Sequence, residues 1–314
     1  MAMGAPTASL ADSFAGLSSG AVAFVDRCDL VTLSGPDARS YLQGQCTQDV
    51  AELSVGEARF TLLLSVQGKV EALCRVGPVD AETFVLDTEV GQGGALLERL
   101  RRFKIRIKAE LTTETALVVR LRGPMIPPAP VAGPDLLVRA PLSGRGYDLI
   151  GERAEVPDAI PLGDGGALEL ARIVAGEPRM TSELDDTTIP FEAGIVQATT
   201  SFTKGCCTGQ ELIARLEARG ANVPRRLRAL RAGPQVPLEA LAPGASVHVG
   251  GEAVGRVTSS ARLPTGEGLV ALAYLQRKVV PPADALVQAG GELPGVPVEV
   301  HELPGLAGPS VLAI

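Results

Sequence analysis

A lysine and two cysteines lie directly before a stretch of helical character. The segment reads Lys204-Gly205-Cys206-Cys207-Thr208-Gly209-Gln210-Glu211, and the apolar spacing over 212–219 is typical of a helix. Thr208 and Glu211 have the spacing of a capping box, which predicts Thr208 as the N-cap and Gly209 as the first helical residue. The positive end of a helix and the ammonium of Lys204 both favour the nucleophilic thiolate. The pattern therefore predicts a reactive cysteine; the alternative is that these cysteines are small buried hydrophobic residues, as most free cysteines are.

The same segment resembles the signature of the folate-binding YgfZ family, whose mitochondrial relatives act in iron–sulfur protein maturation. A tyrosine usually follows the cysteine in that signature, and Cys207 takes its place here. Similar segments occur in order at 41–50, 176–179, 183–184 and 189–194. Segments 251–259 and 268–273 resemble the C-terminal barrel of the glycine-cleavage T-protein superfamily, which contains the YgfZ family. The resemblance implies an α+β fold of three domains in a clover-like arrangement around a folate pocket, with a ferredoxin-like inserted domain and a C-terminal β-barrel.

The resemblance also implies roles for the residues of the signature. Cys206 is expected to be the functional thiol, with Lys204 supporting its thiolate. Gly205 and Gly209 would let the backbone turn tightly, and Gln210 and Arg215 are expected to be structural or to face a partner. Because neighbouring side chains usually point apart, the sequence leaves open whether Cys206 or Cys207 faces the pocket.

One residue argues against the best-known chemistry of the superfamily, which is folate-dependent aminomethyl transfer. In that branch an aspartate at the end of a Gly-Gly-x-x-Asp-Asp stretch interacts with the reacting region of folate, and the corresponding place here is Ala72. Removing a carboxylate that organises proton movement costs a factor of roughly 100 to 10,000 in rate. Glu71 is one residue away, but on a strand its side chain would point to the opposite face.

Folate recognition needs an acceptor for the adjacent N–H donors of the pterin ring. In the superfamily this carboxylate follows a Gly-aromatic pair, and Gly146-Tyr147-Asp148 matches this pattern. The resemblance therefore makes Asp148 a candidate acceptor and Tyr147 a candidate cofactor-binding residue. Glu192 is a second candidate, and an ordinary surface acid is the alternative for both. The chain has no tryptophan, so the ring would stack on tyrosine, phenylalanine or aliphatic side chains. The implied cofactor is tetrahydrofolate.

Composition excludes several other classes. The net charge of −7, from 29 basic and 36 acidic residues, gives no reason to expect nucleic-acid binding or an anionic membrane surface. No apolar run approaches the roughly 20 residues needed to cross a bilayer, and we expect no secretory signal. The odd number of cysteines, five, without paired spacing favours reduced thiols in a cytoplasmic compartment. There is no Cys-x-x-Cys, and both histidines lie near the C-terminus, so we expect no metal site.

Changes in composition and in hydrophobic pattern along the chain predict its division into domains. We expect a discontinuous folate-binding core domain (1–50 and 114–232), an inserted α+β domain (51–113) and a C-terminal β-barrel domain (233–314). Strands are expected at 21–25, 30–33, 60–66, 70–76 and 103–108, the last with a basic solvent face, and in the barrel at 247–249, 253–257, 269–274 and 296–301. Helices are expected at 37–43 and 95–103, and turns at 290–291 and 294–295. Gln67-Gly68-Lys69 and Gly250-Gly251 each separate two expected strands, which predicts two hairpins.

Three functions are compatible with these features. The first is a folate-binding accessory protein of YgfZ type that supports iron–sulfur cluster assembly or repair, with client proteins or assembly factors as partners. The second is a folate-dependent aminomethyltransferase or demethylase, which Ala72 argues against. The third is a non-catalytic scaffold, which the intact thiol motif argues against. Whether any reaction is turned over stays open.

Overall fold

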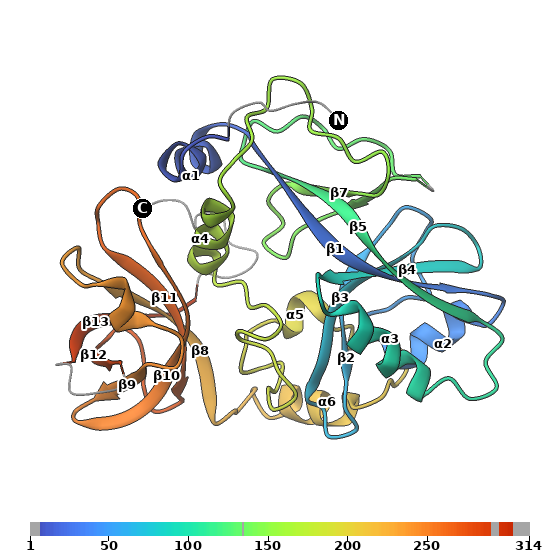
Figure 1. The fold of residues 1–314 in the computed structure, drawn as a ribbon. Helices are drawn as coiled ribbons and strands as arrows, with labels where there is room; N and C mark the ends of the chain where they lie inside the picture. Colours follow the sequence, from blue (N-terminus) through green and yellow to red (C-terminus); the bar gives the residue numbers. More distant parts are fainter. Residues whose placement is uncertain (1–6, 134, 290–294, 304–314) are drawn as a thin grey trace.

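The computed structural model describes residues 7–133, 135–289 and 295–303 of the 314-residue chain. These residues form a seven-stranded antiparallel sheet and a closed six-stranded barrel. Figure 1 shows the barrel on one side, the sheet on the other, and helix α4 (Gly165–Ala175) between them. This combination of helices, an antiparallel sheet and a C-terminal barrel confirms the expected α+β class.

Two long strands organise the sheet. β1 (Val22–Ser34) and β5 (Glu110–Arg122) pair antiparallel along their whole lengths, from Val22 opposite Arg122 to Ser34 opposite Glu110. The two short strands expected at 21–25 and 30–33 are therefore one continuous strand. The full order is β2-β3-β4-β1-β5-β7-β6. The remaining strands are β2 (Arg59–Leu64), β3 (Val70–Pro78), β4 (Thr83–Glu89), β6 (Leu137–Arg139) and β7 (Tyr147–Ile150).

The hairpin predicted from Gln67-Gly68-Lys69 is confirmed as β2 and β3, which pair antiparallel up to Leu64 opposite Val70. Gly68 has φ +71°, a left-handed conformation that glycine adopts without steric cost. A Cβ at this position would lie 2.8 Å from Leu212 Cβ, so the tip of the hairpin packs against the segment that carries the cysteine motif.

Helices cover the sheet where its strands are apolar. α2 (Ala38–Gln45) and α3 (Gly93–Arg102) bury Leu42, Leu96 and Leu100 against sheet residues such as Val31 and Leu86. α1 (Leu10–Ser19) packs with α4, and their apolar residues share a cluster with Leu263 of the barrel. The short helix α5 (Val196–Thr199) and helix α6 (Gln210–Ala218) complete the described helices.

The prediction of a strand at 103–108 is wrong. α3 ends at Arg102, and the following residues form turns and irregular chain, with Arg106 at φ +58°. A positive φ is incompatible with extended backbone, and the Lys108 amide donates to Asp37 Oδ2 at 2.8 Å instead of to a neighbouring strand. The alternation of basic and apolar residues is therefore a feature of a loop.

The barrel has the strand order β10-β11-β8-β13-β12-β9. Its strands are β8 (Arg225–Ala232), β9 (Ser246–Val249), β10 (Glu252–Arg262), β11 (Leu269–Gln276), β12 (Ala283–Gln288) and β13 (Val296–His301), with a 3-10 turn η1 (Leu238–Leu241). The predicted hairpin around Gly250-Gly251 is confirmed. The turns expected at 290–291 and at Pro294 lie outside the described residues.

The division into domains at 50, 113 and 232 stays a prediction. The barrel begins with β8, before residue 233, and the strands of segment 51–113 share one sheet with those on either side. None of the helices in the described ranges has the length and apolar character to span a bilayer.

Candidate functional site

The cysteine motif forms the loop before α6. The helix begins at Gln210, and its N-cap is Gly209, with φ +77° and no side-chain cap. The prediction that Thr208 caps a helix beginning at Gly209 is therefore wrong. The left-handed cap requires glycine, since a Cβ there would lie 2.1 Å from the Ser65 carbonyl oxygen of the β2–β3 hairpin. Glu211, expected in the capping box, pairs instead with Arg215 at 2.6 Å on the exposed face of the helix.

Gln210 replaces the expected capping box. Its side-chain oxygen accepts a hydrogen bond from the Cys207 amide at 3.0 Å, and its side-chain nitrogen donates to the Ser201 carbonyl at 3.3 Å. Gln210 is buried, so these bonds fix the shape of the loop that carries the two cysteines. Of the two roles expected for Gln210, structural or facing a partner, these bonds support the structural one.

Lys204 joins the motif to the end of α2. Its ammonium donates to the carbonyl oxygens of Gln43 (2.6 Å), Cys46 and Gln48 (3.3 Å). The Thr208 amide also donates to the Gly44 carbonyl at 3.2 Å. The structure thus brings together segments 41–50 and 204–211, which the sequence identified separately.

The two cysteines differ in exposure. Cys206 is exposed, whereas Cys207 is partly buried. Burial raises the pKa of the Cys207 thiol, and the nearby Lys204 ammonium opposes this only in part. The expected thiolate therefore finds no support at Cys207. Gly205 has open space around its α-carbon and its backbone does not adopt a positive φ.

A cavity of about 1230 Å³ lies elsewhere in the molecule, between the sheet and α4. One wall comes from β1, β3, β4, β5 and the segment 141–148, and the other from α4 and residues 177–181. Its apolar lining includes Phe24, Phe60, Leu73, Leu142 and Leu168. Neither cysteine of the motif lines it, so the structure separates the candidate thiol from the candidate ligand cavity.

Asp148 lies in the sheet wall of this cavity among three arginines. Its Oδ2 accepts hydrogen bonds from Arg75 (2.6 Å) and Arg120 (3.0 Å), and its Oδ1 lies 2.7 Å from Arg122 Nη2. Sheet register creates this arrangement, because Arg120 of β5 is directly opposite Asp148 of β7. Burial raises the pKa of Asp148, but the guanidiniums of Arg122, Arg75 and Arg120 outweigh it and hold the pKa well below its usual range.

A second aspartate continues the arginine cluster. Asp87 of β4 pairs with Arg75 of β3 at 2.6 Å, across adjacent strands, and with Arg139 of β6 at 3.0 Å. Arg139 is completely buried, and burial lowers its pKa. Within the described residues, Arg120 Nε and Arg139 Nη2 are buried donors without a hydrogen-bond partner, and Asp148 Oδ1, although within ion-pair distance of Arg122, is a buried acceptor without one. The cluster therefore has both donors and an acceptor to spare.

Glu192 and Tyr147 lie outside the cavity lining. Glu192 is buried, pairs with Arg225 of β8 at 3.0 Å and accepts from the Ile189 amide at 3.2 Å. Tyr147 is buried in the apolar cluster of the sheet with Leu121 and Leu149. Of the three residues predicted to bind folate, the structure places only Asp148 at the cavity. Ala72 is also buried away from the cavity, in the core beneath α2 and α3.

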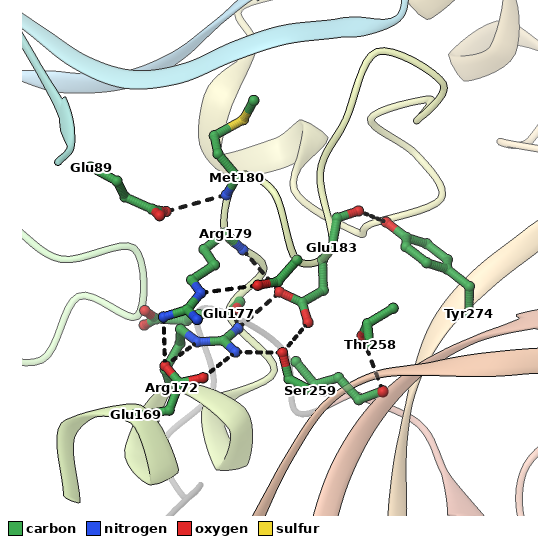
Figure 2. A network of polar contacts seen from close by, with 12 residues as sticks. Glu89, Glu169, Arg172, Glu177, Arg179, Met180, Glu183, Thr258, Ser259 and Tyr274 are labelled. Carbon is green, nitrogen blue, oxygen red and sulfur yellow. Dashed lines mark hydrogen bonds and ion pairs between the residues drawn. The ribbon is translucent and has the colours of Figure 1, made fainter. Parts of the chain in front are cut away.

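The opposite wall carries a second polar network, drawn in Figure 2. Arg172 of α4 donates to Glu169 (2.8 Å), to Glu183 (3.0 Å) and to the hydroxyl of Ser259 in β10 (2.7 Å). The Ser259 hydroxyl also donates to Glu183 at 2.5 Å, and the Tyr274 hydroxyl of β11 donates to the Glu183 carbonyl at 3.0 Å. This network fixes α4 and the following segment to the barrel.

Glu89, at the end of β4, completes the cavity wall beside this network. Its Oε1 accepts from the Met180 amide at 3.3 Å (Figure 2). Burial raises the pKa of Glu89, although the Met180 amide and the guanidiniums of Arg179, Arg172 and Arg120 act in the opposite direction. In the described part of the chain, no group of three or more histidine, cysteine, aspartate or glutamate side chains is arranged to hold a metal ion.

Comparison with known proteins identifies the family. The tRNA-modifying protein YgfZ of Vibrio vulnificus is 27% identical over 220 residues, covering 64% of this chain and 67% of that protein. The mitochondrial iron–sulfur cluster assembly factor IBA57 of Mus musculus is 30% identical over 281 residues, covering 80% of this chain and 76% of that protein. The chain belongs to the YgfZ family. No protein-family model matches it.

The fold of this YgfZ-family chain is that of a glycine-cleavage aminomethyltransferase. The glycine cleavage system aminomethyltransferase T from Bartonella henselae superposes with a TM-score of 0.77 at 18% identity, covering 94% of this chain and 89% of that one. Both the resemblance stated from the sequence and the expected superfamily architecture are thus confirmed.

Sequence reasoning missed most of the ionic residues around the cavity of this YgfZ-family protein. Arg75 follows the apolar run Ala72-Leu73-Cys74 and Asp87 follows Phe84-Val85-Leu86. A charge next to such a buried run has to be paired, because burying it alone is costly. That signal was available in the sequence. The pairing of Arg172 with Glu183 and Ser259 was not, because it depends on how α4 meets the barrel.

Proposed function

We propose that this protein binds tetrahydrofolate in the cavity between the sheet and α4, and that it supports the assembly or repair of iron–sulfur proteins through Cys206. The observation that carries the folate assignment is the cavity, whose volume of about 1230 Å³ exceeds what a ligand of this size needs. Its lining combines phenylalanine and leucine side chains for a flat ring with arginines for carboxylates.

The chemistry of the cavity matches the parts of tetrahydrofolate. The pterin and aminobenzoyl rings are flat and apolar on their faces, and Phe24 and Phe60 provide aromatic surface in a chain without tryptophan. The glutamate part is anionic, and arginine recognises carboxylates through two parallel N–H donors. The family names support the pathway, since one relative is an iron–sulfur cluster assembly factor and another a tRNA-modifying protein.

The exposed position of Cys206 determines how it would act. Its thiol is at the surface, in a loop fixed by Lys204, Gln210 and the left-handed Gly209. It therefore meets a partner protein, such as an iron–sulfur client or assembly factor, and not the folate in the cavity. In this proposal the iron–sulfur cluster is held by the partner protein.

Calorimetry tests the folate assignment with two matched substitutions. Ala171→Trp of α4 fills the cavity, whereas Ala214→Trp places the same side chain on the exposed face of α6. We expect micromolar binding of tetrahydrofolate to the wild type and to Ala214→Trp, and none to Ala171→Trp. Purified Cys206→Ser is expected to bind tetrahydrofolate as the wild type does. In cells that lack the native protein, the same variant is expected not to restore iron–sulfur enzyme activity. Absence of binding to the wild type would refute the folate assignment.

A further inference from the structure

A proline-rich segment connects β5 to β6 and has no part in the proposed function. It reads Met125-Ile126-Pro127-Pro128-Ala129-Pro130-Val131-Ala132, directly after Pro124. Pro124 lines the cavity, but residues 125–132 do not. Residues 126–132 belong to no helix or strand, and their backbone makes no hydrogen bond to other backbone groups in the described part of the chain. The conformation of the segment therefore depends on its own stereochemistry and on side-chain packing.

The prolines restrict five consecutive residues to an extended backbone. The rings of Pro127, Pro128 and Pro130 fix φ at about −65°. Each proline also excludes the residue before it from the helical region, which restricts Ile126, Pro127 and Ala129. Every residue from 126 to 130 thus is a proline or precedes one. Such a sequence forms a polyproline II helix, which has three residues per turn and leaves its backbone carbonyls free to accept hydrogen bonds.

The apolar side chains at the spacing of this helix are exposed. Met125, Pro128 and Val131 are three residues apart, and all three are exposed. Met125 is 71% exposed, and Val131, at 92%, is more exposed than any other large apolar residue in the described ranges. Single exposed apolar residues are ordinary, whereas a contiguous apolar surface indicates a contact with another molecule. We call Met125, Pro128 and Val131 the apolar edge.

A second edge of the segment is held against the protein. Ile126 is partly buried and packs against the apolar cluster of β5 and β7. Ala132 is partly buried as well, and a Cβ added to Gly56 would lie 3.5 Å from its Cβ. At the start of the segment, the Met125 amide donates to the Gly20 carbonyl at 2.9 Å. Because both ends are fixed, little conformational entropy is lost when a partner binds the apolar edge.

We propose that residues 125–132 are a docking site for a protein with a groove lined by aromatic side chains, and that the apolar edge enters this groove. Aromatic grooves recognise polyproline II segments, because flat rings pack against the apolar edge of the helix. The N–H of tryptophan and the O–H of tyrosine can then donate to its free carbonyls. The site is separate from the folate cavity and from Cys206, so it goes beyond the proposed function.

The aromatic groove has to belong to a different protein, because a second copy of this chain does not provide one. The chain has no tryptophan, and its three tyrosines, Tyr41, Tyr147 and Tyr274, are all buried. Phe202 is the one exposed phenylalanine in the described residues, and it is only 39% exposed. Nucleic acids and anionic membranes are not favoured either, since residues 123–133 contain no lysine or arginine.

Tryptophan fluorescence tests the docking site selectively, because this chain has no tryptophan and the emission comes from the partner alone. The probes are purified SH3, WW and EVH1 domains, whose aromatic grooves bind polyproline II segments. The full chain is titrated into each domain. We expect a saturable change of tryptophan emission for at least one of them.

Three variants locate the contact on the chain. Val131→Asp places a charge on the apolar edge and Pro128→Ala removes a ring from it, so each should weaken binding by at least about 10-fold. Val280→Asp is the matched control, because Val280 is 72% exposed on the barrel domain, and it should leave binding unchanged. All three positions are exposed, so we expect the circular dichroism spectra of the variants to match that of the wild type.

Each outcome decides for or against the docking site. A saturable response that both edge variants weaken and Val280→Asp preserves supports it. No response from any of the three kinds of domain refutes it, as does a response that the edge variants leave unchanged. Sedimentation velocity of the chain alone tests the choice of partner: self-association that Val131→Asp abolishes would make a second copy the occupant and refute the proposal.

Discussion

Replacing Arg172 with methionine removes the guanidinium that joins α4 to the barrel. Arg172 makes five hydrogen bonds, to Glu169 (2.9 and 2.8 Å), the Glu177 carbonyl (2.6 Å), Glu183 (3.0 Å) and Ser259 (2.7 Å). Methionine keeps much of the apolar length of the side chain. The substitution therefore tests the polar contacts with little change in packing.

The expected cost follows from the burial of Glu183. Its side chain has no exposed surface, so without Arg172 its carboxylate keeps only the Ser259 hydroxyl and the Arg179 amide. Removing one partner of a buried ion pair typically costs about 3–5 kcal/mol. Since proteins are stable by about 5–15 kcal/mol, this is a large part of the total. The exposed pair of Arg215 and Glu211 provides the control, because such pairs contribute only about 0.3–0.5 kcal/mol.

Urea unfolding, followed by circular dichroism, measures the effect. Arg172→Met is expected to lower the free energy of unfolding by several kcal/mol and Arg215→Met by less than about 0.5 kcal/mol. The double variant Arg172→Met/Glu183→Gln should be more stable than Arg172→Met alone, because it no longer buries an unpaired charge. If Arg172→Met is as stable as Arg215→Met, the reasoning from burial is refuted.

Two further predictions concern the thiols and the acid side of the stability curve. With substoichiometric iodoacetamide, the exposed Cys206 should be alkylated first and Cys207 more slowly, whereas the buried Cys28, Cys46 and Cys74 should react only after unfolding. Burial raises the pKa of the Cys28 and Cys46 thiols to about 12 and that of Cys74 well above its usual value. Peptide mass spectrometry measures the order of labelling, and labelling of Cys207 before Cys206 would contradict the prediction. The pKa of Asp148 is lower in the folded protein than in the unfolded chain, so its stabilising contribution is present above about pH 4 and is lost as the pH falls further. In acid, the slope of the unfolding free energy against pH should therefore be smaller for Asp148→Asn than for the wild type, by up to about 1.4 kcal/mol per pH unit. An unchanged slope would contradict the ionisation of Asp148.

Local sequence patterns correctly predicted the elements whose conformation depends mainly on neighbouring residues in the sequence. The hairpin at Gly68 and the barrel hairpin at Gly250-Gly251 are confirmed, because glycine and the flanking alternation specify these turns directly. The expected strand at 103–108 is wrong, since alternation alone does not show whether a neighbouring strand is there to pair with. β8 was missed because its sequence contains four arginines, whose long side chains conceal the buried Leu227 and Leu230.

The candidate site was predictable only in part for a related reason. The cysteine motif and segment 41–50 are each continuous in sequence, so both were identified, whereas their contact through Lys204 depends on tertiary structure. Asp148 was found from a short local match. Its three arginine partners come from β3 and β5, and only the sheet register shows that they meet. The predicted roles of Asp148, Glu192, Tyr147 and Cys206 stay predictions.

The contacts of Lys204 also set an order of events when the chain folds. Its carbonyl partners at Gln43, Cys46 and Gln48 precede it by 161, 158 and 156 residues, so most of the chain must be synthesised before these bonds can form. Closing so long a loop is entropically costly until the sheet holds α2 in place, and contacts of large sequence separation form slowly. During synthesis the sheet residues emerge first, as domains fold from the N-terminus. The loop that presents Cys206 therefore acquires its shape late, so a chain that is still folding does not offer the thiol in its mature form.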